Sequence, residues 1–222
     1  GQFVAGMSSP LESIPSPTFF QEGSDPQKLE VPHFVARQAE LAQLNEFLER
    51  ALTGHGQVVF VTGGPGRGKS TLVEAFVRQA QENHEALAAA MGNCNAYTGA
   101  GDPYLPFREI LGQLTGDVET GWTTGSIGRS HAQRLWEMMP DAVQTLVSTG
   151  PDLIDTFIPG PSLLARVRAV APEDSSWLAH LAKLGTTRPA GERVVALKQS
   201  DLFEQYVAVG LALSRRGPVR MV

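Results

Sequence analysis

The spacing of apolar residues predicts a helix, a strand and a second helix in the first half of the chain. Between residues 39 and 52, Leu41, Leu44 and Leu48 recur every three to four residues, which predicts an amphipathic helix that Gly54 ends. Residues 57–62 form a short, valine-rich apolar run typical of a strand buried on both faces. Helical spacing returns over residues 69–84. A glycine-rich loop therefore joins the expected strand to the second helix.

The second half of the chain is mainly helical in pattern. Residues 86–91 fit a strand or a helix equally well, because they are rich in alanine. Residues 115–128 predict a loop, and strand pattern resumes at Val219. Helices are expected at residues 107–114, 130–139, 141–149, 162–170, 175–184 and 192–216. Proline and glycine separate these helices, at Pro140, Pro151, residues 159–161, Pro172 and residues 217–218.

Prolines punctuate the first 32 residues, at Pro10, Pro15, Pro17, Pro26 and Pro32. Proline fixes φ and removes an N–H donor, so this spacing discourages both a helix and a central strand. We expect a flexible Pro/Ser-rich linker over residues 1–32 in preference to a folded unit, and a domain over residues 33–222. The segment also contains the phenylalanines Phe3, Phe19 and Phe20, and the sequence does not show what they contact.

Residues 63–70 carry the most specific motif of the chain. They match the phosphate-loop pattern G-x-x-x-x-G-K-[ST] throughout, as Gly63, Gly64, Pro65, Gly66, Arg67, Gly68, Lys69 and Ser70. A chance match in a chain of this length is on the order of one in a hundred at ordinary glycine usage. A plain glycine-rich turn would explain the glycines, but not lysine and then serine at the start of a helix. We therefore predict that the loop binds the phosphates of a nucleotide.

Each residue type in this loop suits a polyphosphate. Backbone N–H groups of a tightly wrapped loop converge on an anion, and glycine at 63 and 68 permits the positive φ angles that wrapping needs. The helix that follows directs unpaired N–H groups and its positive dipole end at the same anion. Lys69 is predicted to neutralise the β- and γ-phosphates, Ser70 to bind Mg²⁺, and Thr71 to support the α-phosphate.

Other polar and aromatic residues carry weaker signals. Asp102 and Arg108 flank the segment 103–107, where loop capping and core anchoring are the expected roles. The five histidines show no metal-ligand spacing. Trp122, Trp136 and Trp177 are scattered, so we expect packing residues and not a surface on which bases stack.

Four segments together resemble a known family. They are FVARQAEL from residue 34, VVFVTGGPGRGKSTLVEAF from residue 58, GNCNAYTGAGDPYLPFREIL from residue 92 and DLFEQYVAVGLALSRRGPVRMV from residue 201. These segments resemble the bacterial AAA-type ATPase domains, origin-recognition-like or STAND-like, of large multidomain regulatory proteins. The resemblance covers about residues 33–222. It implies ATP as the nucleotide, and an α/β P-loop NTPase fold in which a parallel sheet is flanked by helices and carries a large helical insertion.

The resemblance also assigns residues and partners. It implies that Arg37 lies near the adenine end of the nucleotide, although this chain has Ala36 where the family usually has glycine. It implies attached regulatory domains, such as cyclase, kinase or DNA-binding domains, with tetratricopeptide repeats downstream, and oligomerisation is compatible with it. The acidic Walker B pair is expected at the end of the strand that begins at Val219, and no aspartate appears before Val222.

The ends of the chain, at Gly1 and Val222, predict a fragment of a longer polypeptide, truncated before the Walker B strand ends. In related sheets the strands that flank the P-loop strand come later in the sequence than the Walker B strand. The strand at 57–62 would then lack ladder partners, and unpaired N–H and C=O groups are costly when buried. We expect these 222 residues to fold poorly by themselves.

Composition narrows the functional classes. The net charge of −5 argues against a broad nucleic-acid-binding face, which requires clustered basic residues. Cys94 is the only cysteine, so an internal disulfide is impossible, and a single thiol fits a reducing cytoplasm. No apolar run reaches the 18 residues of a transmembrane helix, and the N-terminal residues lack a secretory signal pattern. We expect a cytoplasmic protein with no membrane contact.

Three functions remain open from the sequence. The favoured one is ATP binding, with ATP hydrolysis by the complete protein that rearranges its attached domains. The alternative is a nucleotide-gated switch or scaffold without significant turnover, since both depend on the P-loop. A P-loop small-molecule kinase ranks below them, because the helical stretch 130–216 shows no acceptor site. No turnover is expected from the 222 residues alone, because the Walker B and sensor residues are missing.

Overall fold

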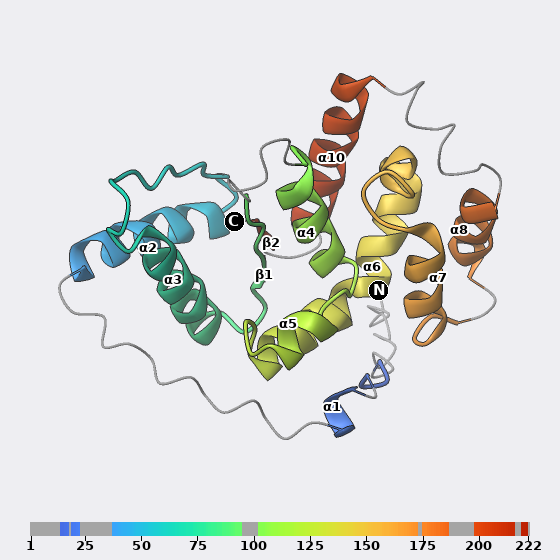
Figure 1. Ribbon diagram of the computed structural model, residues 1–222, viewed down its shortest axis with the longest axis horizontal. Coiled ribbons are helices and arrows are strands. Elements are labelled where there is room, and N and C mark those ends of the chain that lie inside the picture. Colours follow the sequence, from blue (N-terminus) through green and yellow to red (C-terminus); the bar gives the residue numbers. More distant parts are fainter. Residues whose placement is uncertain are drawn as a thin grey trace, which may run out of the picture.

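The computed structural model describes residues 14–17, 19–22, 37–94, 102–172, 175–186, 198–215 and 219–221 (Figure 1). Its elements in chain order are α1 (Phe19–Glu22), α2 (Gln38–Leu52), α3 (Lys69–Asn83), β1 (Ala88–Ala90), α4 (Leu105–Leu114), α5 (Glu119–Thr123), α6 (Arg129–Thr149), the 3-10 helix η1 (Pro151–Leu153), α7 (Gly160–Arg168), α8 (Ser176–Thr186), α10 (Gln199–Ser214) and β2 (Val219–Met221). No helix in these ranges is long and apolar enough to cross a membrane.

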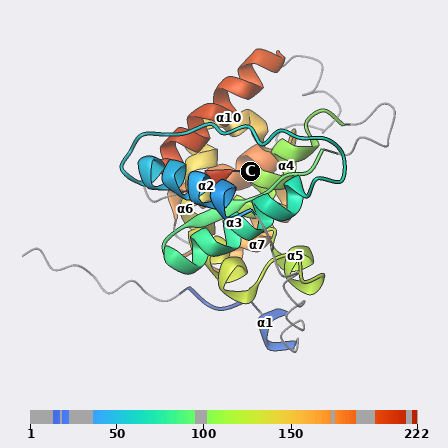
Figure 2. The ribbon, with the colours of Figure 1, turned by 90° about the vertical axis from the view of Figure 1, so that its left-hand side faces the viewer.

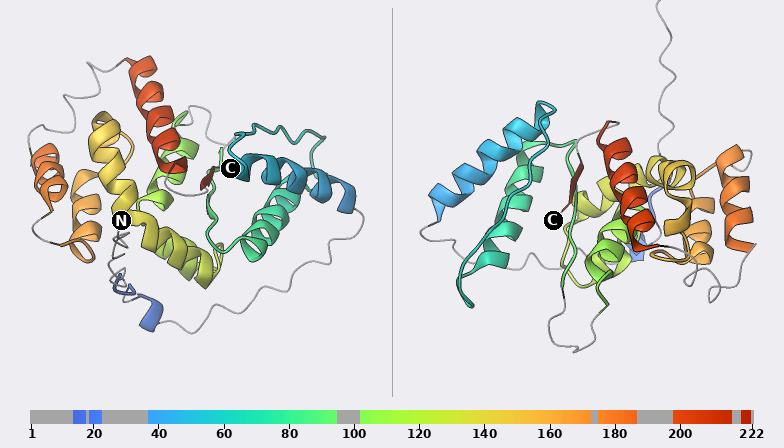
Figure 3. Two further views of the ribbon diagram at one scale, coloured as in Figure 1. Left: turned by 180° about the vertical axis from the view of Figure 1, so that it is seen from behind. Right: turned by 90° about the horizontal axis from the view of Figure 1, so that it is seen from above.

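A parallel pair of strands, β1 and β2, lies between two layers of helices. Ala88 pairs with Val219 and Ala90 with Met221. Successive side chains of a strand point to opposite faces. Ala89 accordingly joins an apolar cluster with α2 and α3, whereas Ala88 and Ala90 join a larger cluster built by the helices that follow β1. Figure 3 shows the same division, with α2 and α3 on one side of the strands and the other helices opposite.

The smaller cluster matches the expected amphipathic helices. Leu44 and Leu48 of α2 pack with the buried residues of α3, Leu72, Phe76, Val77 and Ala80, and with Leu87 and Ala89. The predicted ranges, 39–52 and 69–84, agree with the observed helices within a residue or two. The alanine-rich stretch 86–91, left open between strand and helix, contains strand β1. The strand expected from Val219 is also confirmed, as β2.

The expected strand at residues 57–62 is wrong for this structure. Residues 55–64 have no regular secondary structure, and Val58 and Phe60 are 84% and 85% exposed. Figure 2 shows the segment as a long extended connection between α2 and α3. A strand is stabilised only by a neighbouring strand that pairs with its backbone, and no described strand lies beside this one. The predicted multi-stranded parallel sheet is therefore reduced, in the described residues, to the β1–β2 pair.

Pro140 does not divide two helices as predicted. A single helix, α6, runs from Arg129 to Thr149 with Pro140 inside it. Proline in a helix interior costs about 3 kcal/mol. Buried residues on both sides of the proline, including Trp136, Met139 and Val143, pack the two halves of α6 against the larger cluster. Packing therefore outweighs the local preference.

Residues 115–128, expected to form a loop, contain the short helix α5 with a buried Trp122. The turn before it ends α4 in a Schellman motif, in which the N–H of Asp117 donates to the Gly112 carbonyl at 2.9 Å and that of Gly116 to the Gln113 carbonyl at 3.1 Å. Gly116 has φ +86°, and a Cβ there would lie 2.5 Å from the Met139 sulfur. Both the backbone angle and the close contact therefore require glycine.

The described part of the expected linker is packed on the larger cluster. Phe20 is 5% exposed and belongs to this cluster, and Phe19 and Ile14 pack against it. Ile14, Phe19 and Phe20 are therefore packed residues within the predicted linker, and the linker boundary at residue 32 stays a prediction. Positions 192–197 and 216 of the predicted helix 192–216 lie outside the described residues, and α10 covers Gln199–Ser214 of it.

Candidate functional site: the loop at residues 63–70

The loop at residues 63–70 is wrapped tightly at the N-terminus of α3. A turn at Pro65 and Gly66 reverses the chain, and Gly66 has φ +70°. Gly68 adopts the left-handed conformation, with φ +67° and ψ 33°, directly before the first helical residue, Lys69. Its carbonyl accepts the first helical bond, from the Leu72 N–H at 3.0 Å. Only glycine adopts such angles without strain, which explains the motif's need for glycine at position 68.

Lys69 closes the loop from within. Its Nζ donates hydrogen bonds to the carbonyl oxygens of Gly63 at 2.9 Å and Gly64 at 3.0 Å. The lysine side chain thus folds back across the loop from the start of α3 to the start of the motif. An ammonium group has three donors, so two bonds to carbonyl oxygens leave a third donor for an anion. The arrangement places a positive charge inside the curve of the loop.

Arg37 reaches the same loop from α2, thirty positions earlier in the chain. It is the N-cap residue of α2, and its guanidinium donates to the carbonyl oxygen of Arg67. The family resemblance placed Arg37 near the adenine end of the nucleotide, which stays a prediction; in the structure its side chain contacts the loop itself. The contact pins the peptide group just before Gly68, at the point where the backbone turns left-handed.

The remaining predicted site residues are accessible. Pro65, Arg67, Ser70 and Thr71 are exposed, the last two on the first turn of α3. The first four N–H groups of a helix lack intrahelical partners, and the helix dipole adds partial positive charge there. With Arg37, Arg67 and Lys69 around the loop, this end of α3 has the donors and the positive charge that suit a phosphate group.

The sequence did not single out three polar side chains that secure the outer edge of β1. His131 on α6 contacts the Ala89 carbonyl through Nε2 at 2.6 Å, and Arg134 donates to the Leu87 carbonyl at 3.4 Å. Gln113 on α4 both accepts from the Met91 N–H at 3.0 Å and donates to the Met91 carbonyl at 2.7 Å. Burial lowers the pKa of His131, and this effect exceeds the opposing effect of the Ala89 hydrogen bond. A polar residue on an otherwise apolar helix face was the available signal.

Other candidates have structural roles. Asp102 accepts from the Tyr104 N–H at 3.0 Å and pairs with Arg108 at 3.2 Å, so the predicted loop capping is confirmed. Trp122 and Trp136 are buried in the larger cluster, as expected of packing residues. The described residues contain no group of three or more His, Cys, Asp or Glu side chains that could hold a metal ion.

Comparison with known proteins supplies the family. No curated protein and no solved structure matches this chain. A family model described as an AAA ATPase domain matches residues 33–197, which include the loop and Arg37 and make up more than half of the chain. The chain therefore belongs to the AAA ATPase domain family, a family of P-loop nucleotide-binding proteins.

Proposed function

We propose that residues 63–71 bind the phosphates of ATP with Mg²⁺, and that the complete protein hydrolyses ATP as a STAND-like module of a multidomain signalling or transcriptional regulator. The observation that carries the proposal is the Lys69 ammonium group held between the Gly63 and Gly64 carbonyls, inside a loop that ends in the left-handed Gly68. Family membership supports the nucleotide-binding part of the proposal. The regulatory role and the attached domains depend on the resemblance alone.

Different residues of the loop contribute different interactions to the proposed nucleotide binding. The backbone of residues 63–68 and the first turn of α3 supply N–H donors, Lys69 supplies charge, and the exposed Ser70 hydroxyl is placed to ligate Mg²⁺. Mg²⁺, when bound, neutralises charge on the β- and γ-phosphates. Arg37 stabilises the loop through the Arg67 carbonyl, so its effect on affinity is indirect.

A nucleotide-gated switch without significant turnover is the second candidate. It requires the same loop, because phosphate binding is common to both functions. The two differ in whether the complete protein has a carboxylate that activates water for attack on the γ-phosphate. Steady-state turnover by the complete protein distinguishes them, since a switch would bind ATP with the same loop and release it unhydrolysed.

The test is a calorimetric titration of Mg-ATP into Lys69→Ala, with Lys183→Ala on α8 as a matched loss of one lysine remote from the loop. Charge-assisted hydrogen bonds to two phosphates are lost in Lys69→Ala, so we expect affinity to fall about 100-fold or more. Lys183→Ala should bind as the unchanged protein does. Equal affinity of Lys69→Ala and the unchanged protein would refute the assignment.

A further inference from the structure

The short N-terminal segment, residues 14–17 with Phe19 and Phe20, lies on an aromatic face of the helical layer. We define the aromatic face by three residues: Trp122 of α5, and Arg129 and Trp136 of α6. Arg129 and Trp136 are seven positions apart, two turns of helix, so they project from the same side of α6. Phe20, Trp122 and Trp136 are 5%, 3% and 7% exposed, so the contact excludes solvent from all three rings.

The contacts are specific to the residues of the segment. The Phe20 ring meets Trp122 edge-to-face at 5.4 Å and 89°, and the Phe19 ring meets Trp136 at 6.0 Å and 89°. The Arg129 guanidinium lies over the Phe20 ring, 5.5 Å from its centre. Edge-to-face and cation–π pairs both contribute beyond simple burial of area.

The backbone of the segment is recognised as well. Trp136 Nε1 donates a hydrogen bond to the Pro15 carbonyl at 3.0 Å, and Pro17 is buried. The Phe20 N–H donates to the Pro17 carbonyl at 3.1 Å, which closes the turn that presents both phenylalanines to the aromatic face. Proline fixes the backbone angle before that turn and so reduces the entropy lost on docking.

The segment has no means of holding this shape by itself. Helix α1 has four residues, far fewer than an isolated helix needs in water. Its position therefore depends on the aromatic face. The next helix in the chain, α2, packs in the other apolar cluster, across the strand pair from the docked segment. When the segment is docked, the N-terminal part of the chain therefore contacts the apolar clusters on both sides of the strand pair.

We propose that the aromatic face is a docking site for a proline-flanked phenylalanine pair, and that the chain's own residues 14–17, Phe19 and Phe20 are its occupant, as a reversibly docked linear motif. Two properties follow from reversible docking. Loss of the Phe20 ring releases the segment while the helical layer stays folded, and a free peptide with the same sequence occupies the vacated face.

The first experiment measures release by proteolysis of the full chain with a glutamate-specific protease, following cleavage after Glu22 by mass spectrometry. Burial of one phenylalanine side chain corresponds to a shift of roughly 10- to 100-fold in the docking equilibrium, so Phe20→Ala should be cleaved faster by about that factor. Trp136→Phe removes the bond to Pro15 and replaces the ring that Phe19 contacts by a smaller aromatic one, so it should accelerate cleavage at least roughly 2- to 10-fold. Phe47→Ala, a loss of the same ring from α2, should leave the rate unchanged.

The second experiment adds a peptide of residues 11–22, which contains no tryptophan or tyrosine, to Phe20→Ala in a Trp177→Phe background. Release should shift the emission of Trp122 and Trp136 to longer wavelength, and the peptide should reverse the shift, whereas a peptide carrying Phe20→Ala should not. Cleavage of Phe20→Ala at the rate of the unchanged protein would overturn the proposal. So would global loss of helical circular dichroism in this variant, or an emission that does not respond to millimolar peptide.

Discussion

At the scale of single residues, we expect phosphate charge to be neutralised by one residue of the loop and Mg²⁺ to be bound by another. The Lys69 ammonium is already held by two carbonyl oxygens, whereas the Ser70 hydroxyl is exposed on the first turn of α3. We therefore expect Lys69 to contribute to phosphate binding whether or not a cation is present. A serine hydroxyl contributes mainly through the cation that it ligates.

This difference predicts that the contribution of Ser70 to ATP affinity depends on Mg²⁺. In Ser70→Ala, the affinity for ATP should fall about 10-fold in the presence of Mg²⁺, because one oxygen ligand of the cation is lost. With the cation removed by a chelator, Ser70→Ala and the unchanged protein should bind ATP equally. Calorimetry under both conditions measures the effect, and an equal loss in both would contradict the role of Ser70.

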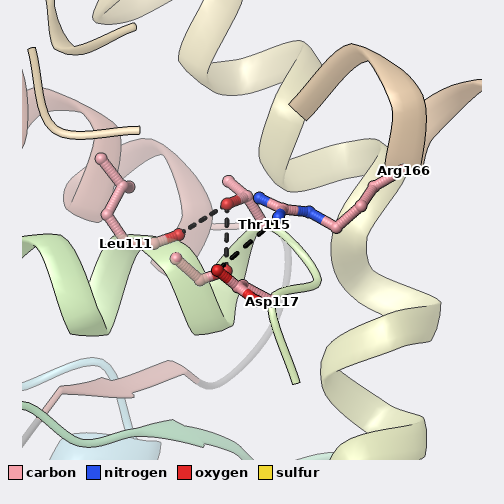
Figure 4. A network of polar contacts seen from close by, with 5 residues as sticks. Leu111, Thr115, Asp117 and Arg166 are labelled. Atoms are coloured by element: carbon pink, nitrogen blue, oxygen red, sulfur yellow. Dashed lines mark hydrogen bonds and ion pairs between the residues drawn. The ribbon is translucent and has the colours of Figure 1, made fainter. Parts of the chain in front are cut away.

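A second residue-scale feature is the partly buried ion pair between α7 and the turn after α4 (Figure 4). Arg166 Nη1 lies 3.6 Å from Asp117 Oδ2, and the Arg166 side chain is 20% exposed while that of Asp117 is 58% exposed. Nε and Nη2 of Arg166 are buried with no hydrogen-bond partner among the described residues. Burial lowers the pKa of Arg166, and the Asp117 carboxylate offsets part of that effect.

The desolvation of Arg166 is therefore incompletely compensated. Arg166→Met keeps an apolar stem and removes the buried charge, so the free energy of unfolding should fall by less than about 0.5 kcal/mol or rise. Asp117→Asn leaves the guanidinium without its counter-charge and should lower that free energy by about 0.5–1 kcal/mol, since the carboxylate is well solvated. Urea unfolding measures both values, and a larger loss in Arg166→Met than in Asp117→Asn would contradict this account.

At the scale of elements, strand β1 has one partner strand and an outer edge covered by side chains. His131, Arg134 and Gln113 contact the backbone of Ala89, Leu87 and Met91 along this edge. The side-chain amide of Gln113 accepts from the Met91 N–H and donates to the Met91 carbonyl, as the backbone of a neighbouring strand would. An uncovered edge offers unpaired groups to other chains, so these side chains protect the strand from further pairing.

The buried His131 predicts a dependence of stability on pH. Its folded pKa lies below the ordinary value of 6.5, so the unfolded state binds a proton more readily than the folded state. Stability should therefore be highest above pH 6.5 and fall as the pH drops through that value. The positive charge of Arg134 adds to the depression of the pKa, after burial as the main cause.

His131→Gln isolates this effect. Glutamine keeps an N–H donor for the Ala89 carbonyl but cannot take up a proton in this range. The difference in unfolding free energy between the two proteins, measured in urea from pH 8 to pH 5, should change in favour of the variant as the pH falls. A difference that is constant over this range would show that His131 titrates as it does in the unfolded chain.

At the scale of the whole molecule, the two apolar clusters are unequal. The cluster of α2 and α3 has eight buried members, and the larger cluster contains twenty-nine. The segment before the loop adds little to the smaller one, since Val58 and Phe60 are exposed and only Val61 packs against it. We therefore expect the side of the domain that carries the loop at residues 63–70 to be the less stable one.

Unfolding in urea should then occur in two stages. All three tryptophans lie in α5, α6 and α8, so their fluorescence reports the larger cluster alone, whereas circular dichroism also reports α2 and α3. We expect part of the helical signal to be lost at a lower urea concentration than the fluorescence signal. Mg-ATP should move this early loss to higher urea, because it binds the folded loop. A single steep transition shared by both probes would contradict the prediction.

Local sequence determined the features that depend on neighbouring residues. The helices at 38–52 and 69–83 follow from apolar spacing, and the loop follows from glycines whose backbone angles no other residue adopts easily. The assignment of phosphate-binding residues needed no tertiary information either, because the motif lies within eight consecutive positions. Whether these residues bind ATP remains a prediction of the sequence.

Tertiary structure decided the rest, because the deciding contacts join residues far apart in the chain. Residues 57–62 have every local feature of a strand and form none, since pairing requires a partner strand that no local pattern supplies. Pro140 should have ended a helix, but buried side chains on both sides of it hold α6 together. Phe19 and Phe20 gained their partners only when α5 and α6 brought Trp122 and Trp136 together. Burial and strand pairing depend on contacts between residues far apart in the chain, whereas turn geometry and helical periodicity depend on residues close together in it.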